Sequence, residues 1–262
     1  MQRLFFLRAY GDFVIGLQQI AKSNKPIHIV ASLHLQPLYE ALLNAFIIPP
    51  LSIEFVNFGI TQGQLNYFTN KRLLHTTTIK QLGLIKNYIQ LHPNSKGQDY
   101  IEQDIRLSSF NFFTKANCKS VVGKNKKVYQ AYGQFLGIEH EMLLDYKADQ
   151  AKNIIIFPDA RQKKKEIPAI ALGKLIQEKT LNGNTVKVAR FNNTHPKELG
   201  YHNFKELIDL IQASDYIISA DSLPAHITQA LGKEHAIYYN NEMNRFCTPY
   251  VIQHKSYILA NG

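Results

Sequence analysis

An acid, a hydroxyl and an imidazole are crowded into one predicted junction between a strand and a helix. The apolar run Tyr216–Ala220 predicts a buried strand, and Ala225–Leu231 predicts the helix that follows it. At the junction lie Asp221, Ser222 and His226. Ligands of open α/β sheets bind at the carboxyl ends of strands, where free N–H groups of a helix N-terminus favour a phosphate. The junction therefore predicts a phosphate-binding turn, although Asp221 or Ser222 could instead only cap the helix and His226 could pack beneath it.

A basic loop follows a second apolar run. The segment Ile154–Phe157 predicts a buried strand, and the loop after it carries Arg161, Lys163, Lys164 and Lys165. Lys and Arg can compensate the charge of a diphosphate without a metal ion. A solvated surface loop is the alternative interpretation, but the position after a buried strand equally favours a ligand site.

The third group follows the first predicted strand, Leu4–Leu7. Gly11 permits a tight turn, and Asp12 stands at the start of the next predicted helix. Asp12 is a plausible helix cap, and a carboxylate at such a strand end can also act as a general base. Transfer of a sugar from a nucleotide-linked donor needs a base and anion-binding loops. Asp12 near the start of the chain could supply the base, and the basic loop and the Asp221 turn in the second half could supply the anion-binding loops. Because there is no Asp-x-Asp pair, a divalent metal bridging the diphosphate is not expected, and the sequence predicts no cofactor.

Composition and charge narrow the class of protein. The chain has 262 residues, of which 45% are hydrophobic and 19% charged, and this is typical of globular proteins. Its two cysteines, Cys118 and Cys247, lie in no CxxC or Cys/His cluster, which favours a reducing cytoplasm. The net charge of +10 suits nucleic acid, an anionic membrane surface or a phosphorylated small molecule. Without a recognisable nucleic-acid-binding motif, charge alone is weak support for nucleic acid, so no such partner is expected.

Strand and helix patterns alternate along the chain. Further strands are predicted at Leu4–Leu7, Ile27–Ala31, Ser52–Asn57, Val186–Phe191 and His235–Tyr239, and His235–Tyr239 is expected to be the last strand along the chain. Helices are predicted at Phe13–Lys22, Leu38–Phe46, Val128–Leu136, Ala169–Lys179 and Phe204–Ala213, and a helix or a helix with a strand at Ile79–Gln90. This alternation predicts parallel sheets with helices on both faces.

The alternation stops in the polar stretch Ile138–Asn153 and then restarts. We therefore place a linker there and expect two α/β domains with a cleft between them, residues 1–147 and 148–262. The resemblance to a known family described below implies that the second domain binds the donor and the first the acceptor.

Three blocks of the chain, in order, resemble the heptosyltransferases of glycosyltransferase family 9. These are Leu4–Leu17 with its Arg and Gly-Asp, the strand and basic loop Ile154–Pro168, and the turn Asp221–His226 followed by Ala230-Leu231-Gly232-Lys233. The basic loop ends Lys-Glu-Ile-Pro where the family has Lys-x-Trp-Pro, and Leu223 stands where the family turn has a glycine.

The resemblance implies a GT-B fold, with two Rossmann-like domains facing a central cleft, and an inverting, metal-independent transfer. It implies that Asp12 is the base, that Lys165 stabilises the leaving diphosphate, and that Asp221, Ser222 and His226 bind the donor. Gly11, Arg161, Lys164 and Leu223 join the expected donor site. The expected partners are a nucleotide sugar and an acidic glycolipid or glycan of the lipopolysaccharide type, at the inner face of the plasma membrane.

Other functions stay open at this point. Another GT-B activity, with a different sugar and a capsule or protein acceptor, fits the same residues. A catalytically silent sugar-nucleotide-binding or assembly protein also fits, because the side chain of Leu223 occupies a place where a glycine lets phosphates approach the backbone.

Overall fold

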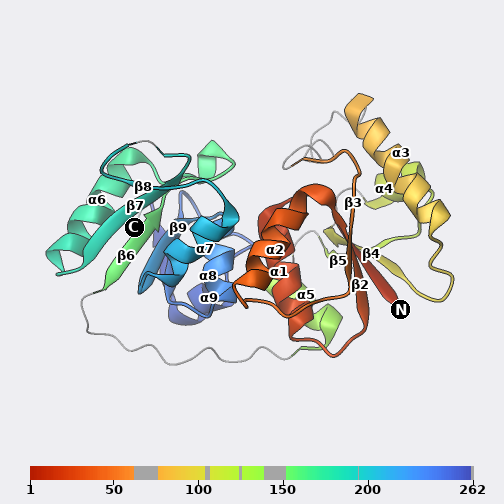
Figure 1. Cartoon of the computed structure of the whole chain (residues 1–262). Helices are drawn as coiled ribbons and strands as arrows, with labels where there is room; N and C mark the ends of the chain where they lie inside the picture. Colours follow the sequence, from red (N-terminus) through yellow and green to blue (C-terminus); the bar gives the residue numbers. More distant parts are fainter. Residues whose placement is uncertain (62–75, 104–106, 124–125, 139–151, 194, 261–262) are drawn as a thin grey trace. The chain divides into compact units, whose positions relative to one another are not determined.

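The computed structural model describes residues 1–61, 76–103, 107–123, 126–138, 152–193 and 195–260. The chain divides into two compact units, Met1–His140 and Glu141–Gly262 (Figure 1). In each, described strands form a parallel sheet with helices between them, so the predicted α/β class with two Rossmann-like domains is confirmed. The predicted boundary between residues 147 and 148 lies outside the described residues.

The first unit is built on one parallel sheet. Its strands are β1 (Gln2–Phe6), β2 (Ile27–Ser32), β3 (Ile53–Val56), β4 (Asp99–Gln103) and β5 (Lys119–Val122), and its helices are α1 (Tyr10–Ala21), α2 (Gln36–Asn44, after the 3-10 turn η1, Leu33–Leu35), α3 (Thr76–Leu91), α4 (Leu107–Thr114) and α5 (Val128–Leu136). The strand order is β3-β2-β1-β4-β5, and all described pairs are parallel. The chain order therefore reverses between β1 and β4, which makes this the topological switch point of the sheet.

Side chains of β1 alternate between two helical layers. Phe5 and Leu7 belong to a buried cluster with Ile85 of α3 and Phe110 of α4. Phe6 points to the other face, where its ring centroid lies 5.3 Å from Phe13 of α1 and its ring stacks on Tyr132 of α5. Figure 1 accordingly shows α1 and α5 on one side of the strands and α3 and α4 on the other. A strand buried on both faces is apolar throughout, as Leu4–Leu7 is.

The second unit has the same construction. Its strands are β6 (Asn153–Phe157), β7 (Thr185–Phe191), β8 (Leu199–Tyr201), β9 (Tyr216–Ala220), β10 (His235–Tyr239) and β11 (Tyr257–Leu259), and its helices are α6 (Ala169–Leu181, after the 3-10 turn η3, Lys163–Lys165), α7 (Phe204–Gln212), α8 (Leu223–Ala230) and α9 (Pro249–His254). The parallel order β11-β10-β9-β6-β7-β8 reverses between β6 and β9. The switch point of this sheet lies between those two strands.

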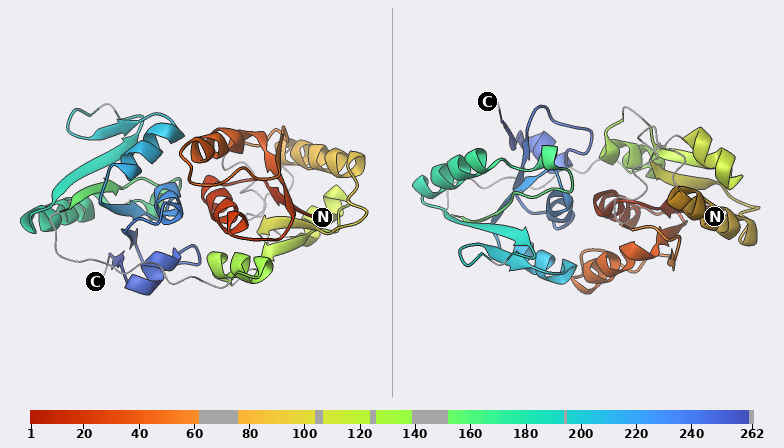
Figure 2. Two further views of the ribbon diagram at one scale, coloured as in Figure 1. Left: turned by 60° about the horizontal axis from the view of Figure 1, so that its bottom comes forward. Right: turned by 90° about the horizontal axis from the view of Figure 1, so that it is seen from above.

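Two apolar clusters cover the faces of the second sheet. Ile156 of β6 and Ile218 of β9 pack in a cluster with Leu172 of α6, whereas Ile237 of β10 packs with Val251 of α9 on the opposite side. The two views of Figure 2 show α6 on one face of these strands and α8 and α9 on the other. Isoleucine-rich strands are expected in such doubly covered sheets.

Several elements were missed in the sequence. The prediction that His235–Tyr239 is the last strand is wrong, because α9 and the short β11 follow it. The stretch Asp99–Val122 holds β4, α4 and β5, yet β4 mixes acids and an amide with one aromatic and one aliphatic residue and β5 begins with Lys and Ser. Short, partly polar strands lack the apolar runs used for prediction. No helix of the described part has the length and apolar character that crossing a membrane requires.

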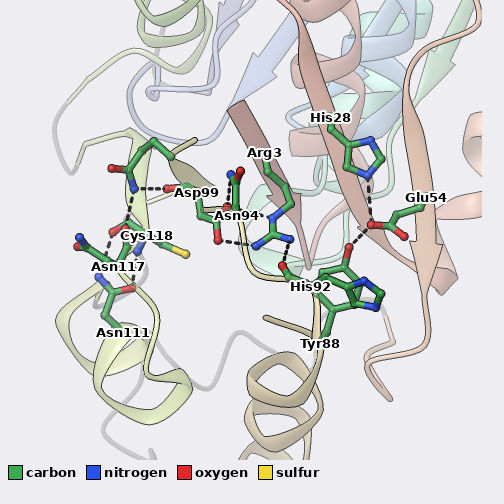
Figure 3. Close-up of polar contacts among 11 residues, drawn as sticks. Arg3, His28, Glu54, Tyr88, His92, Asn94, Asp99, Asn111, Asn117 and Cys118 are labelled. Atoms are coloured by element: carbon green, nitrogen blue, oxygen red, sulfur yellow. Dashed lines mark hydrogen bonds and ion pairs between the residues drawn. The ribbon is translucent and has the colours of Figure 1, made fainter. Parts of the chain in front are cut away.

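A network of polar side chains lies at the amino-terminal ends of the strands of the first sheet (Figure 3). The guanidinium of Arg3 donates to both carboxylate oxygens of Asp99, at 2.9 and 2.7 Å, and to the carbonyl oxygen of His92 at 2.6 Å. Beside it, Glu54 accepts from the hydroxyl of Tyr88. Arg3 therefore joins β1 to β4 and to the residue that follows α3.

Candidate functional site

The candidate residues of the second unit meet at the switch point of its sheet. Lys165 ends η3 in the loop after β6, and Asp221 directly follows β9. The Nζ atom of Lys165 donates to Oδ2 of Asp221 at 2.5 Å. The Asp221 side chain is 3% exposed and that of Lys165 is 28% exposed, so the acid is buried and the cation reaches the surface. A cation is thus anchored at the place where ligands of such sheets bind.

A third loop joins this contact. Asn244 lies after β10, and its side-chain amide donates to the same Oδ2 atom of Asp221. The backbone N–H of Phe246 donates to Oδ1 of Asn244 at 2.8 Å, and the Lys165 ammonium lies 5.4 Å from the centroid of the Phe246 ring. Asn244 and Phe246 were not among the residues predicted from the sequence. Their loop could have been singled out, because it also follows the carboxyl end of a parallel strand, where ligands bind.

The turn itself does not act by capping α8. Ser222 is the N-cap residue with an extended backbone, but its side chain makes no cap hydrogen bond. Its Oγ instead donates to the carbonyl oxygen of Ala220 at 3.3 Å, and the Asp221 carboxylate is held by Lys165. The interpretation that Asp221 or Ser222 serves only as a cap is therefore wrong. Leu223 is the half-buried first residue of α8.

His226 lies beneath the turn as a buried residue of α8. Burial lowers its pKa to about 4, the carboxylate of Asp221 opposes this shift, and the Lys165 cation adds to it. His226 is therefore a neutral imidazole at neutral pH. The charges of both Lys165 and Asp221 act on His226, so the imidazole lies close to this pair.

A cavity of about 670 Å³ lies along the basic loop, at the N-terminus of α6. Lys163 and Lys164 line it, together with Arg190 of β7, while the exposed Arg161 does not. Arg190 forms ion pairs with Asp159 and Glu198, so its charge is partly compensated.

Hydrogen bonds from one asparagine side chain fix the loop that lines this cavity. The side chain of Asn240, directly after β10, donates to the carbonyl oxygens of Lys164 and Glu166 at 2.6 and 3.0 Å. Burial raises the pKa of Asp159 against the opposing charge of Arg190. The cavity thus combines lysine ammonium groups, carboxylates and the start of a thirteen-residue helix without an acid in its first turn. This is a suitable environment for a phosphorylated, hydroxyl-rich ligand.

The other two candidate residues, Gly11 and Asp12, lie in the first unit. Asp12 is buried within the first turn of α1, whose N-cap residue is Ala9, so the interpretation of Asp12 as the N-cap is wrong. Gly11 lies in the same helical turn and is not among the described residues with positive φ, so no tight turn depends on it. A carboxylate in the first turn is favoured by the helix dipole.

A second acid at the same switch point escaped sequence analysis. Glu102 of β4 is completely buried, its Oε1 atom accepts from the backbone N–H of Leu7 at 3.2 Å, and Nε of Arg8 lies 3.5 Å away. No sequence signal marked it, because β4 itself was missed. Asp12 and Glu102 thus both belong to the carboxyl-terminal side of the first sheet.

Metal ligands do not gather in the described part of the chain. Among its residues, no group of three or more His, Cys, Asp or Glu side chains is placed to hold a metal ion. Cys118 and Cys247 are both buried, and no disulfide bond joins them.

Comparison with known proteins adds a family and a fold. The sequence profile of glycosyltransferase family 9 (heptosyltransferase) matches residues 81–261, which include the basic loop and the Asp221 turn but not Asp12. A search of curated protein sequences gave no match.

Several solved structures are similar over nearly the whole chain, and three of them illustrate this. The E. coli heptosyltransferase WaaC with ADP has a TM-score of 0.57 at 11% identity, covering 99% of this chain and 92% of its own. A family 9 glycosyltransferase from Veillonella parvula has a TM-score of 0.58 at 14% identity, covering 98% and 84%. E. coli ADP-heptose lipopolysaccharide heptosyltransferase II has a TM-score of 0.54 at 12% identity, covering 98% and 89%. At these identities the similarity establishes the fold, which is that of the GT-B heptosyltransferases.

Proposed function

Because the chain belongs to glycosyltransferase family 9, we propose that it transfers a heptose-like sugar from a nucleoside-diphosphate donor to a lipopolysaccharide or related surface glycan. The observation that carries the proposal is the contact of Lys165 with Asp221 at the switch point of the second sheet, beside a cavity at the start of α6. Both features lie within the region that matches the family.

The donor's diphosphate is the part of the substrate that the second unit suits best. Lys163 and Lys164 line the cavity, and the first turn of α6 begins there. The backbone N–H groups at a helix N-terminus favour the binding of an anion. Lys165 would oppose the charge that develops on the diphosphate as it leaves, and Asp221 with Asn244 would hold that ammonium in place. Lysine supplies the positive charge here, which supports a transfer without a divalent metal.

The acceptor is activated by a single carboxylate in this proposal. The Asp12 carboxylate takes the proton of the acceptor hydroxyl. At the same time the oxygen of that hydroxyl forms a bond to the anomeric carbon of the sugar. The bond from that carbon to the diphosphate oxygen breaks, and the nucleoside diphosphate leaves with the electron pair. Attack from the face opposite the leaving group inverts the anomeric centre, as one displacement with one general base requires.

The charge of the chain supports an acidic acceptor. A net charge of +10 favours a phosphorylated glycolipid and the anionic inner face of a plasma membrane, where a cytoplasmic enzyme would meet it. Neighbouring structures make ADP-linked heptose the first donor to test, because WaaC was solved with ADP and with ADP-2-deoxy-2-fluoro heptose.

The donor can be identified by thermal denaturation with ADP, GDP, UDP, CMP and their sugar conjugates. A ligand of the native state at a hundred times its Kd stabilises by about 2.7 kcal/mol, so a bound nucleotide raises the melting temperature measurably. We expect a selective shift with one nucleoside diphosphate that persists in EDTA. A shift that EDTA abolishes would contradict metal-independent binding, and the absence of any shift would contradict the proposal as a whole.

A further inference from the structure

We propose that Glu102 is a positioning residue for Asp12: a completely buried acid at the switch point of the first sheet, whose contact with Arg8 determines how much of the charge of that guanidinium is left to the Asp12 carboxylate. This inference rests on the proposed role of Asp12 as the base. Nothing in the sequence motifs points to Glu102, and its own position in the sheet carries the argument.

The topology places the three residues together. β1 and β4 are adjacent, with Phe5 paired to Ile101, and the strand order of the sheet reverses between them. Arg8 follows β1 directly, and Asp12 lies in the first turn of α1. Glu102, the residue after Ile101, is therefore at the switch point of the first sheet, as Asp221 is in the second.

Only one of the two carboxyl oxygens of Glu102 has polar contacts among the described residues. Its Oε1 atom accepts from the N–H of Leu7 at 3.2 Å and lies 3.5 Å from Nε of Arg8. Its Oε2 atom is buried and has no hydrogen-bond partner among the described residues, and the same is true of the buried hydroxyl of Tyr132. An oxygen without a donor is poorly suited to carry negative charge, whereas a protonated carboxyl group needs less solvation.

Charge balance requires one proton on the pair of acids beside Arg8, and the deeper burial of Glu102 assigns that proton to it. The groups of the described chain that act on Glu102 are Arg8 and the Leu7 N–H from the end of β1, Asp12 from α1, and Tyr132 from α5. Complete burial raises the pKa of Glu102 to about 8, Arg8 opposes the shift and the charge of Asp12 adds to it. Tyr132 stays a neutral phenol, because burial and the two acids raise its pKa well above the usual value. One cation and one anion then remain, instead of a buried excess of negative charge.

A neutral Glu102 has a chemical consequence for its neighbours. When Glu102 is protonated, the Asp12 carboxylate is the acid of this group that is left to balance the charge of Arg8. When Glu102 loses its proton, a second carboxylate competes for Arg8 and repels Asp12, so the base is less well positioned. Transfer should accordingly decline as pH rises through the pKa of Glu102.

The protonation state can be measured directly on the full chain by NMR of side-chain carboxyl carbons in protein labelled with ¹³C-glutamate. The Glu102 resonance is assigned by its loss in Glu102→Gln. We expect it to titrate with a midpoint of about 8, and to move to lower pH in Asp12→Asn, because the charge of Asp12 is one cause of the shift. A Glu102 titration in the ordinary range near 4.5, or one unmoved by Asp12→Asn, would overturn the proposal. If Glu102→Gln does not fold, the one carboxyl resonance that titrates far above the others and responds to Asp12→Asn serves instead.

The consequence for transfer is read from the pH profile of kcat/KM. In the wild type it should fall about tenfold per pH unit above the Glu102 midpoint, as loss of one proton requires. Glu102→Gln keeps an acceptor for the Leu7 N–H without the charge, so at neutral pH it should stay within about threefold of wild type and lose this decline. Glu178→Gln, on the exposed side of α6, is the matched control and should keep the wild-type profile. A folded but inactive Glu102→Gln would show that the ionised acid is needed.

Failure of the proposed function would look different. If Asp12→Asn were fully active, Asp12 would not be the base, whatever the titration of Glu102. If Asp12→Asn were inactive while Glu102 titrated normally, only the positioning role would be refuted.

Discussion

The ammonium of Lys165 donates to the carboxylate of Asp221 at 2.5 Å, and this contact joins the loop after β6 to the turn after β9. These two strands flank the point at which the second sheet reverses its order. Residues that are 56 positions apart thus meet at the edge where an open α/β sheet binds its ligand. A partly exposed cation held by a buried acid is suited to binding a phosphate that arrives from solvent.

Replacing Lys165 with Ala should weaken binding of the nucleoside diphosphate by about tenfold or more, or about 1.4 kcal/mol, while binding of the bare nucleoside changes little. The reason is that the ammonium opposes phosphate charge and has no role toward the base or ribose. Titration calorimetry with both ligands measures the difference. Lys205→Ala is the control, since Lys205 pairs with Asp209 on the exposed surface of α7. Equal losses for the two ligands would refute the phosphate role.

Asp12→Asn should reduce the rate of transfer by about 10²- to 10⁴-fold, the usual contribution of a general base. Nucleotide binding should stay near the wild-type value, because Asp12 belongs to the first unit and the candidate donor residues with phosphate chemistry belong to the second. Steady-state kinetics and nucleotide titration on the same preparation test both statements. Wild-type turnover in this variant would remove Asp12 from the mechanism.

Acid should destabilise the second unit through its buried histidines. Burial lowers the pKa values of His226 and His235 to about 4, below the usual 6.5. Between these values the unfolded chain binds protons that the folded chain does not, so the free energy of unfolding falls as pH drops from 6.5 towards 4. Burial is what keeps His235 neutral, because the hydrogen bond from its Nδ1 atom to the carbonyl oxygen of Lys233 opposes the lowering of the pKa. The hydroxyl of Thr248 lies 2.7 Å from its Nε2 atom.

Melting temperatures across this pH range measure the effect. Carboxylates also contribute to acid denaturation, so the informative quantity is the difference between variants. His235→Phe keeps an aromatic ring beside Tyr250 and should show a shallower decline, whereas the exposed His195→Gln should decline as the wild type does. Parallel curves for wild type and His235→Phe would argue against the buried neutral imidazole.

Arg3→Ala should destabilise the first unit by about 3–5 kcal/mol, because it leaves the buried carboxylate of Asp99 without its cation. The two side chains are only 8% and 12% exposed. Urea denaturation of the variant, compared with the exposed-pair control Lys205→Ala, tests this. A change no larger than that of the control would show that the network in Figure 3 adds little to stability.

The sequence was informative wherever strands are apolar and loops carry charge. Both sheet cores are visible as runs such as Ile154–Phe157, and the turn at Asp221 and the basic loop to Lys165 are marked by their residue types. The contact between them was not predictable, because it depends on β9 lying beside β6 rather than beside β8. Glu102 was missed for a related reason, since a buried acid within a partly polar strand resembles a surface residue until its neighbours are known.

Capping was overestimated for the same local reason. Asp and Ser before a helix favour an N-cap by propensity, yet Asp221 is held by Lys165 and Asn244 from loops distant in sequence. Asp12 likewise lies two residues inside the helix that it was expected to cap. In both places the side chain has contacts or charge partners that a local pattern cannot reveal.

The most direct test of sugar transfer is mass spectrometry of a truncated lipopolysaccharide acceptor after incubation with the protein and ADP-heptose, followed by other nucleoside-diphosphate sugars. With the wild type we expect the acceptor to gain one glycosyl unit and a nucleoside diphosphate to be released, and we expect both products to be lost in Asp12→Asn. A donor that binds tightly but is never transferred to any such acceptor would contradict the proposed transfer. That result would leave a sugar-nucleotide-binding protein in its place.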